Sequence, residues 1–404
     1  MDSTLSFTND PRESADSMRK RHSVALLLET SNAYSRGLLD GIIAYQREHE
    51  LWSIYIGEQQ RGAKPPAWFS NWQGDGIIAR IETEAIAAAV KRSGLPAVDV
   101  SAARRVPHLP WVETNDREIA RLAASHLIER GFRELAFYGE PDFNWSQWRE
   151  DHFTEFARQS GCNFQVFRAA SRAEKGYSWS RERRRLIAWV RKLPKPIGVM
   201  ACYDFGGQQL LDVCRELDIA VPEQMAVIGV DDDARLCRLC TPPLSSVIPD
   251  THRAGYEAAK LLDRMMNGER IVGEAILIPP RGIAQRQSSD VYAVDDPDVV
   301  AALRFIREHA CDGISVGDVL RVVPLSRRML EHRFQKLIGR TPHAEIMRIR
   351  IERTSRLLRE TDLTLAEIAR RTGFPHAEYL SVAFKRQTGQ TPRGYRRDSR
   401  TSPR

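Results

Sequence analysis

The sequence lacks long apolar runs and contains few cysteines. None of its 404 residues falls in a run of about eighteen apolar side chains, so we predict no membrane-spanning helix. The polar first twenty-one residues lack the apolar segment of a secretory signal, which predicts a cytoplasmic location and no membrane partner. Six cysteines scattered over a chain of this length suit reduced thiols better than a disulfide framework.

The sequence also lacks the short motifs of common α/β enzymes. It has no G-x-x-x-x-G-K, no G-x-S-x-G and no paired His or Cys spacing that would hold a metal. Cys237 and Cys240 have the spacing of half a zinc site, but no second pair lies nearby, so we expect structural thiols. The first apolar run is followed by ETSNAY instead of a glycine-rich loop. We therefore expect no catalytic residues, nucleotide site, metal or cofactor.

Residues 22–290 alternate short apolar runs with amphipathic helical patterns. The runs, each typical of a buried strand in a parallel sheet, span residues 24–28, 76–79, 135–138, 198–201 and 226–230. The helical patterns span residues 37–49, 84–92, 117–130, 148–159, 181–191, 206–217 and 253–266. This alternation predicts βαβ units in a doubly wound α/β domain. Residues 1–21 lack periodicity, and we expect a disordered tail there.

Positive charge is concentrated near the C-terminus. The whole chain has a net charge of +7, but residues 298–404 contain 22 Lys and Arg against 12 Asp and Glu. The rest of the chain is therefore slightly negative. The acidic stretch within residues 291–298 predicts a linker, after which residues 299–397 contain helical patterns only. A basic helical domain is typical of proteins that bind DNA phosphates.

This basic domain contains an internal repeat of about fifty residues. Residues 315–342 and 364–392 each combine a first amphipathic helix, a turn and a second helix. The shared landmarks are Leu330, Phe334 and residues 339–342 in the first unit, and Leu380, Phe384 and residues 389–392 in the second. The last landmark is G-x-T-P in both units, where Gly ends a helix and Pro prevents its continuation.

The turns inside the two units differ. Gly373 lies in the second turn, where a tight turn often needs a positive φ, and we expect Pro375 in the opening turn of the next helix. The first unit has Pro324 where the second has Gly373, so we expect a different turn shape there.

The second helix of the second unit has a polar outward face. Its members are His376, Glu378, Ser381 and Lys385. Polar side chains contact base edges and cations contact phosphates, so this face suits DNA. A plain helical bundle would also have a polar face, but duplication, turn chemistry and charge together favour two helix-turn-helix units.

The second unit is similar to the signature of the AraC/XylS family of transcription regulators. The similar residues are 368–374 (IARRTGF), Tyr379, Leu380, Phe384, Lys385 and 389–396 (GQTPRGYR), and the resemblance extends through both units. It implies two helix-turn-helix units joined by one long helix, expected at residues 343–359. Such a helix sets two recognition helices into neighbouring major grooves.

This resemblance also implies the residues that contact DNA. By position, the family's base-reading sites fall on Arg328, Glu331, His332, Ala377, Glu378 and Ser381. Arg328 is suited to guanine, and the two glutamates are suited to cytosine N4. We expect Arg327, Lys385 and Arg386 to bind phosphates.

Residues 22–290 resemble the two-lobed LacI-type and periplasmic sugar-binding fold, most clearly at residues 201–233 and 241–247, whereas residues 101–113 have no clear counterpart. Sugar sites combine aromatic faces with fixed charged groups, at the carboxyl ends of strands. The resemblance implies Arg149, Asp204, Asp231, Trp145 and Trp148 as ligand contacts from the second lobe. It implies Tyr34, Arg36, Arg80 and Asp116 as contacts from the first.

Both modules together resemble the XylR-type regulators of xylose operons. The predicted function is a DNA-binding activator that responds to a pentose such as xylose through lobe closure. Its expected partners are double-stranded DNA, the sugar effector, RNA polymerase and a second copy of the chain. Two alternatives stay open: a ligand-independent repressor or architectural DNA-binder, and an α/β sugar enzyme, which the missing catalytic motifs disfavour.

Overall fold

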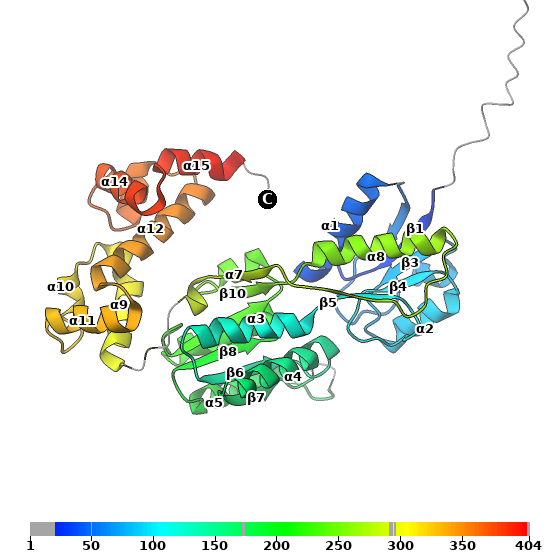
Figure 1. The fold of residues 1–404 in the computed structure, drawn as a ribbon, viewed down its shortest axis with the longest axis horizontal. Helices are drawn as coiled ribbons and strands as arrows, with labels where there is room; N and C mark the ends of the chain where they lie inside the picture. Colours follow the sequence, from blue (N-terminus) through cyan, green and yellow to red (C-terminus); the bar gives the residue numbers. More distant parts are fainter. Residues whose placement is uncertain (1–20, 50, 172–173, 291–293, 295, 402–404) are drawn as a thin grey trace, which may run out of the picture.

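The structure, a computed structural model, describes residues 21–401 apart from residues 50, 172–173, 291–293 and 295. The predicted tail thus lies outside the described residues except for Arg21. Two α/β lobes, each built on a six-stranded sheet, are followed by a helical domain (Figure 1). The fold class predicted from the sequence is confirmed.

Lobe one is built on an all-parallel sheet with the strand order β11-β5-β4-β3-β1-β2. The strands are β1 (Ser23–Leu27), β2 (Ser53–Ile56), β3 (Gly76–Ala79), β4 (Ala97–Asp99), β5 (Trp111–Thr114) and β11 (Ala275–Ile278). Its helices are α1 (Ala33–Glu48), η1 (Ala67–Asn71), α2 (Glu84–Ser93) and α8 (Thr251–Met266). Side chains alternate between the faces of a strand, so Val24 and Leu26 pack under α1 and α8, and Ala25 and Leu27 pack under α2.

Lobe two has the order β12-β10-β9-β8-β6-β7, with only β12 antiparallel among the described strands. The strands are β6 (Glu134–Gly139), β7 (Asn163–Arg168), β8 (Ile197–Ala201), β9 (Met225–Val230), β10 (Ser245–Ile248) and β12 (Gly282–Ala284). The helices are α3 (Asp116–Glu129), α4 (Asn144–Gln159), α5 (Trp179–Lys192), α6 (Asp204–Glu216), α7 (Ala234–Leu239) and the short η2 (Gln287–Ser289). Helices α3 and α4 cover one face, and α5, α6 and α7 cover the other.

The five predicted strands and seven predicted helices are all present, with ends shifted by a few residues. The largest shifts are in α1 and α4, which begin at Ala33 and Asn144, each four residues before the predicted start. Several strands that the sequence did not predict are short or border the sheets, such as β4 and β12. Such segments lack the continuous apolar run of a central strand.

The chain crosses between the lobes three times, at residues 114–116, 248–251 and 278–282. The crossings are hydrogen-bonded to one another: Asn115 N donates to Ile278 O (2.7 Å), and Arg281 N donates to Ile248 O (2.8 Å). Three adjacent backbone crossings form a hinge, because a few φ/ψ changes there reorient one whole lobe.

The helical domain contains α9 (Pro297–His309), η3 (Ala310–Asp312), α10 (Val316–Val319), α11 (Arg327–Ile338), α12 (Pro342–Glu360), α13 (Leu365–Arg371), α14 (Ala377–Thr388) and α15 (Pro392–Thr401). Two apolar cores lie side by side along α12, which supplies Ile346 to the first and Leu358 to the second. The long helix predicted at residues 343–359 is thus confirmed. Its 19 residues span about 28 Å.

The structure confirms the predicted roles of three turn glycines and contradicts the predicted position of one proline. Gly373 has a φ of +72°, and Gly339 and Gly389 end their helices in the left-handed region. The prediction that Pro375 lies in the opening turn of a helix is wrong. Helix α14 begins only at Ala377, because the His376 side chain caps it by accepting a hydrogen bond from Tyr379 N.

The helical domain begins two residues earlier than predicted, because α9 starts at Pro297. Asp296 caps α9, and Pro297 and Asp298 already belong to this helix, although they fall in the predicted linker. Residues 291–293 and 295 of that linker lie outside the described residues.

Helices α1 and α8 cross at glycines, which generates a stability prediction. A Cβ on Gly41 would lie 1.9 Å from the carbonyl oxygen of His252, so Gly41→Ala forces the helices apart. We expect this substitution to lower the free energy of unfolding by about 1–3 kcal/mol. At Gly57 the nearest atom would be 3.5 Å away, so the control Gly57→Ala changes stability by less than about 0.5 kcal/mol. Equal urea midpoints for the two variants would contradict the close crossing.

Candidate functional site

A cavity of about 290 Å³ lies between the lobes, at the carboxyl ends of their strands. It is lined by Tyr34, Arg61, Arg80, Glu113, Trp145, Arg149 and Asp231. Five of these seven residues were predicted as sugar contacts, and the structure brings them together from both lobes. Arg61 and Glu113 were not predicted.

Arg149 on α4 is held rigidly at the cavity. It is 3% exposed, its Nε donates to Asp116 Oδ1 (2.6 Å), and its Nη1 donates to Cys202 O (2.6 Å). The guanidinium lies 5.1 Å from the centroid of the Trp145 ring. Burial raises the pKa of Asp116 although Arg149 opposes the shift, and Asp116 Oδ2 has no hydrogen-bond partner among the described residues.

Lobe one contributes a second buried cluster around Arg80. This guanidinium pairs with Glu82 (2.7 Å) and Glu29 (3.5 Å) and lies 4.9 Å from the Tyr34 ring centroid. The Tyr34 hydroxyl donates to the Glu113 carboxylate. Burial, reinforced by Asp116, raises the pKa of Glu113 to about 7 although Arg80 opposes the shift.

Asp231 follows β9 in a strained backbone conformation, with a φ of +103°. A non-glycine residue in this region is held there by its surroundings, which is common at ligand sites. Burial raises the pKa of its carboxyl group, and the facing guanidinium groups of Arg149, Arg61 and Arg80 oppose that shift. The carboxylate therefore faces three cations across the cavity.

Arg61 is the main residue that the sequence interpretation missed. It lies in the loop after β2 in lobe one, yet its guanidinium lies 5.3 Å from the Trp145 ring and 5.1 Å from the Tyr203 ring in lobe two. The buried atoms Arg61 Nε and Trp145 Nε1 have no hydrogen-bond partner within the described chain. An arginine beside Gly62 in an irregular loop carries no signal that separates it from a solvated turn residue.

The other predicted sugar contacts lie outside the cavity lining. Asp204 accepts hydrogen bonds from Ser246 Oγ (2.6 Å) and Asp233 N (2.8 Å) behind the strand ends. Arg36 pairs with Asp233 across the lobes (3.4 Å), and Trp148 packs edge-on against Trp111. The assignment of Asp116 to lobe one is wrong, because it begins α3, which packs on the sheet of lobe two.

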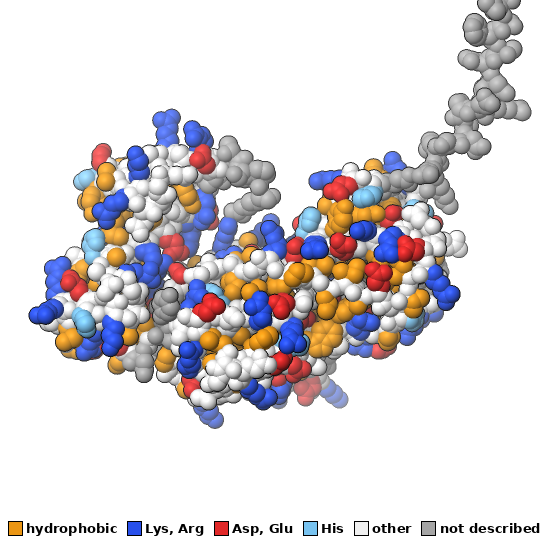
Figure 2. Space-filling view, viewed as in Figure 1, with side chains coloured by type: hydrophobic (Ala, Val, Ile, Leu, Met, Phe, Trp, Pro, Cys, Tyr) orange, Lys and Arg blue, Asp and Glu red, His pale blue; other side chains and the backbone are white. Residues whose placement is uncertain are grey.

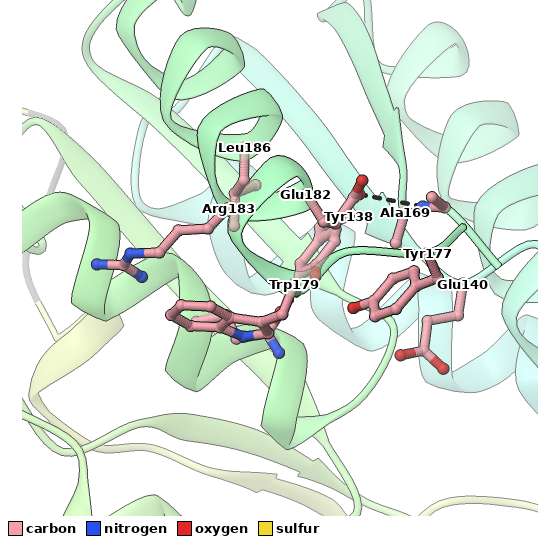
Figure 3. Close-up of a pocket in the computed structure, with 10 residues that line it drawn as sticks. Tyr138, Glu140, Ala169, Tyr177, Trp179, Glu182, Arg183 and Leu186 are labelled. Carbon is pink, nitrogen blue, oxygen red and sulfur yellow. Dashed lines mark hydrogen bonds between the residues drawn. The ribbon is translucent and has the colours of Figure 1, made fainter. Parts of the chain in front are cut away.

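A second cavity of about 450 Å³ lies in lobe two (Figure 3). Tyr138, Tyr177 and Trp179 supply its aromatic walls, and Glu140 and Glu182 supply carboxylates. The carboxylates already accept hydrogen bonds, Glu140 from Tyr203 Oη (2.6 Å) and Glu182 from Ala170 N (3.0 Å). None of the predicted sugar contacts lines this cavity, and it does not join the two lobes, so the smaller inter-lobe cavity is the better candidate for a sensor site.

The predicted DNA contacts lie on α11 and α14 and at His376, which caps α14. The face of the helical domain seen in Figure 2 carries many Lys and Arg side chains. Arg327, Arg328, His332, His376, Glu378, Lys385 and Arg386 are exposed, and Glu331, Ala377 and Ser381 are half-buried. Arg327 pairs with Glu331 along α11 (3.1 Å), and Ser381 Oγ donates to Ala377 O (2.8 Å). Lys385 and Arg386 have no ion-pair partner among the described residues.

Family models match most of the chain. Residues 23–117 match the XylR N-terminal domain, residues 124–289 a periplasmic binding protein-like domain, and residues 319–398 a helix-turn-helix domain. The xylose operon regulatory protein of Escherichia coli K12 is 34% identical over 385 residues, which cover 93% of this chain and 97% of that protein. The chain belongs to the family of xylose operon regulatory proteins.

Two further relatives support this family assignment. The xylose operon regulatory protein of Haemophilus influenzae is 31% identical over 93% of this chain and 98% of its own length. A solved structure of the xylose-binding transcription activator XylR superposes with a TM-score of 0.80 at 33% identity, covering 94% of this chain and 99% of that one. The chain is therefore a DNA-binding transcription regulator, and the enzyme alternative is rejected because these homologues are regulators.

The described residues contain neither a membrane-spanning helix nor a metal-binding cluster. No helix there combines the length and apolar character needed to cross a bilayer. The same residues contain no group of three or more His, Cys, Asp or Glu side chains placed to bind a metal ion.

The raised pKa of Glu113 predicts how stability depends on pH. The pKa of Glu113 is about 7 in the folded state and 4.5 in the unfolded chain, so the folded state binds this proton more tightly. The free energy of unfolding therefore falls as pH rises from about 4.5 through about 7. We expect Glu113→Gln to remove this loss in urea unfolding. The control Glu84→Gln changes an 80% exposed side chain and keeps the wild-type pH profile. A wild-type profile for Glu113→Gln would contradict the shifted pKa.

Proposed function

We propose that the inter-lobe cavity binds D-xylose or a closely related pentose, and that this binding controls how the helical domain binds DNA. The observation that carries the proposal is the cavity lining itself, in which three arginines and two carboxylates from both lobes share one cavity with Tyr34 and Trp145. The relatives named as xylose operon regulatory proteins support this choice of ligand.

Each lining group has a role that matches sugar chemistry. The Trp145 ring offers an apolar face to ring C–H groups, while its Nε1 supplies a buried donor. Arg80 and Arg149 donate to hydroxyl oxygens, and Asp231 accepts from hydroxyl groups. Buried donors without partners gain hydrogen bonds only when the ligand enters, which favours a polyhydroxyl molecule over an apolar one.

In the helical domain, we infer that α11 and α14 enter successive major grooves. The α12 helix spans about 28 Å between the two units, close to one DNA turn of about 34 Å. Arg328 binds guanine, Glu331 and Glu378 accept from cytosine N4, and the remaining base contacts come from His332, His376, Ala377 and Ser381. Arg327, Lys385 and Arg386 bind phosphates.

The regulator acts, on this proposal, as a cytoplasmic homodimer that recruits RNA polymerase when sugar is bound. Sugar binding favours one arrangement of the lobes, and this arrangement has a different affinity for DNA. The change in DNA affinity can be no larger than the ratio of the sugar affinities of the two lobe arrangements. A ligand-independent repressor or architectural DNA-binder would instead show the same DNA affinity with and without sugar.

The sugar site is tested by Asp231→Asn. We expect xylose affinity, measured by calorimetry on the full chain, to fall about 30-fold or more, because a buried charged hydrogen bond is lost. DNA affinity without sugar stays unchanged, since Asp231 lies in the sensor. The control Asp151→Asn changes an exposed carboxylate on the same lobe and keeps wild-type values. Loss of sugar-free DNA binding in Asp231→Asn would instead assign this residue a folding role.

The phosphate contact is tested by Arg386→Ala. We expect weaker binding to every DNA sequence and a salt slope lower by about one, because one fewer counterion is released. Arg184→Ala removes an exposed arginine from α5 of the sensor and serves as the matched control with an unchanged slope. A wild-type slope for Arg386→Ala in titrations at several salt concentrations contradicts the contact.

A further inference from the structure

Helix α9, the first helix of the DNA-binding domain, contacts one segment of lobe two. Arg304 and Arg307, one helical turn apart, both reach the segment that joins α6 to β9. Arg304 Nη1 binds Asp218 Oδ2 (2.6 Å), and Arg307 Nη1 donates to Val221 O (2.5 Å). Arg307 Nη2 also donates to the Glu223 carboxylate.

These two ion pairs differ in burial. The Glu223 side chain is 0% exposed and that of Arg307 is 21% exposed, whereas the Asp218 side chain is 82% exposed. Glu223 Oε1 accepts the hydrogen bond from Arg307, whereas the buried Glu223 Oε2 has no hydrogen-bond partner among the described residues, so removing Arg307 would leave this buried carboxylate without its cation. Arg307 thus fixes α9 on lobe two, while the exposed Arg304 pair adds little.

The contacted segment is connected to the inter-lobe cavity by two rigid elements. Strand β9 leads from this segment to Asp231 in the cavity lining. Helix α6 leads from the same segment back to its first residue, Asp204. The Asp204 carboxylate accepts hydrogen bonds from Asp233 N and Ser246 Oγ, close to the carboxyl end of β9. The segment is itself braced, because Ala220 N donates to Gln224 Oε1 (2.9 Å) and Gln224 N donates to Ala220 O (2.9 Å).

The other contacts between the sensor and the helical domain are weaker. Gln287 Nε2 lies 3.4 Å from Glu352 Oε2, and Arg238 lies 3.6 Å from Glu360, with both residues of the ion pair about two-fifths exposed. Arg348 binds Asp290 at 3.1 Å but also pairs with Glu345 on its own helix. Among these contacts, the Arg307–Glu223 pair is the one with a fully buried partner.

We infer that Arg307 and Glu223 are the positioning pair that transmits the state of the sugar cavity to the DNA-binding domain. This inference rests on the proposed function. Rotation of lobe two moves the α6–β9 segment, and α9 follows because its guanidinium is anchored to a buried carboxylate. Arg307 and Glu223 lie outside the lining of the inter-lobe cavity and outside α11 and α14, so each acts on DNA affinity only through the orientation of the two domains.

The test compares DNA affinity with and without saturating D-xylose in the full chain. The wild-type ratio of the two affinities is expected to be about fivefold or more. We expect Arg307→Met to reduce this ratio toward one while xylose affinity stays within about twofold of wild type. Arg307→Met alone leaves the buried Glu223 carboxylate without a cation and can destabilise the fold. The double variant Arg307→Met/Glu223→Met removes both charges, and we expect it to lower the ratio of DNA affinities as Arg307→Met does. The control Arg304→Met keeps the wild-type ratio.

The outcomes separate this inference from the proposed function. A wild-type ratio of one at saturating xylose contradicts the proposed function itself. A wild-type ratio above one that survives in the folded double variant overturns the positioning pair alone. Thermal unfolding and xylose titration of each variant establish that it is folded, and loss of the ratio in the Arg304→Met control would also overturn the inference, since any contact would then suffice.

Discussion

The buried pairing of Arg149 with Asp116 is the interaction on which the cavity depends. Both side chains are almost fully buried, so removing either one would leave the other as a buried group without its ion-pair partner. The same guanidinium also binds the Cys202 carbonyl at the end of the neighbouring strand, and this fixes its plane against Trp145. A fixed guanidinium loses little entropy when a ligand hydroxyl approaches, which is the property a sugar site needs.

The charges around this pair come from both lobes. Arg61 and Arg80 belong to lobe one, and Arg149 and Asp231 belong to lobe two, so the electrostatic balance of the cavity is complete only when the lobes approach each other. Direct contacts between the lobes near the cavity include the Arg36–Asp233 pair and the hydrogen bond from Asn144 Nδ2 to Ala102 O (3.2 Å). A ligand that bridges the two sets of charges therefore shifts the lobe arrangement, and β9 and α6 extend that shift toward the DNA-binding domain.

Sequence patterns predicted those parts of the structure that local physics determines. Central strands such as β9 are continuous apolar runs, and Gly373 has the positive φ that its turn requires. Arg149 and Asp231 were expected from the resemblance to the two-lobed sugar-binding fold, in which the carboxyl ends of parallel strands meet at the ligand. Arg61 and Glu113 were missed because the first lies in an irregular loop and the second in the short strand β5, preceded by residues without a clear counterpart in the resemblance. Asp204 follows a strand as expected, but its carboxylate binds Ser246 and Asp233 N behind the edge, an arrangement that no local pattern reports.

Pentose binding between the lobes is tested most directly by a crystal structure of the full chain grown with D-xylose. We expect one sugar in the inter-lobe cavity, packed on Trp145 and hydrogen-bonded to Arg149 and Asp231. Sugar density in the aromatic cavity of lobe two instead, or an empty inter-lobe cavity at saturating xylose, would contradict it.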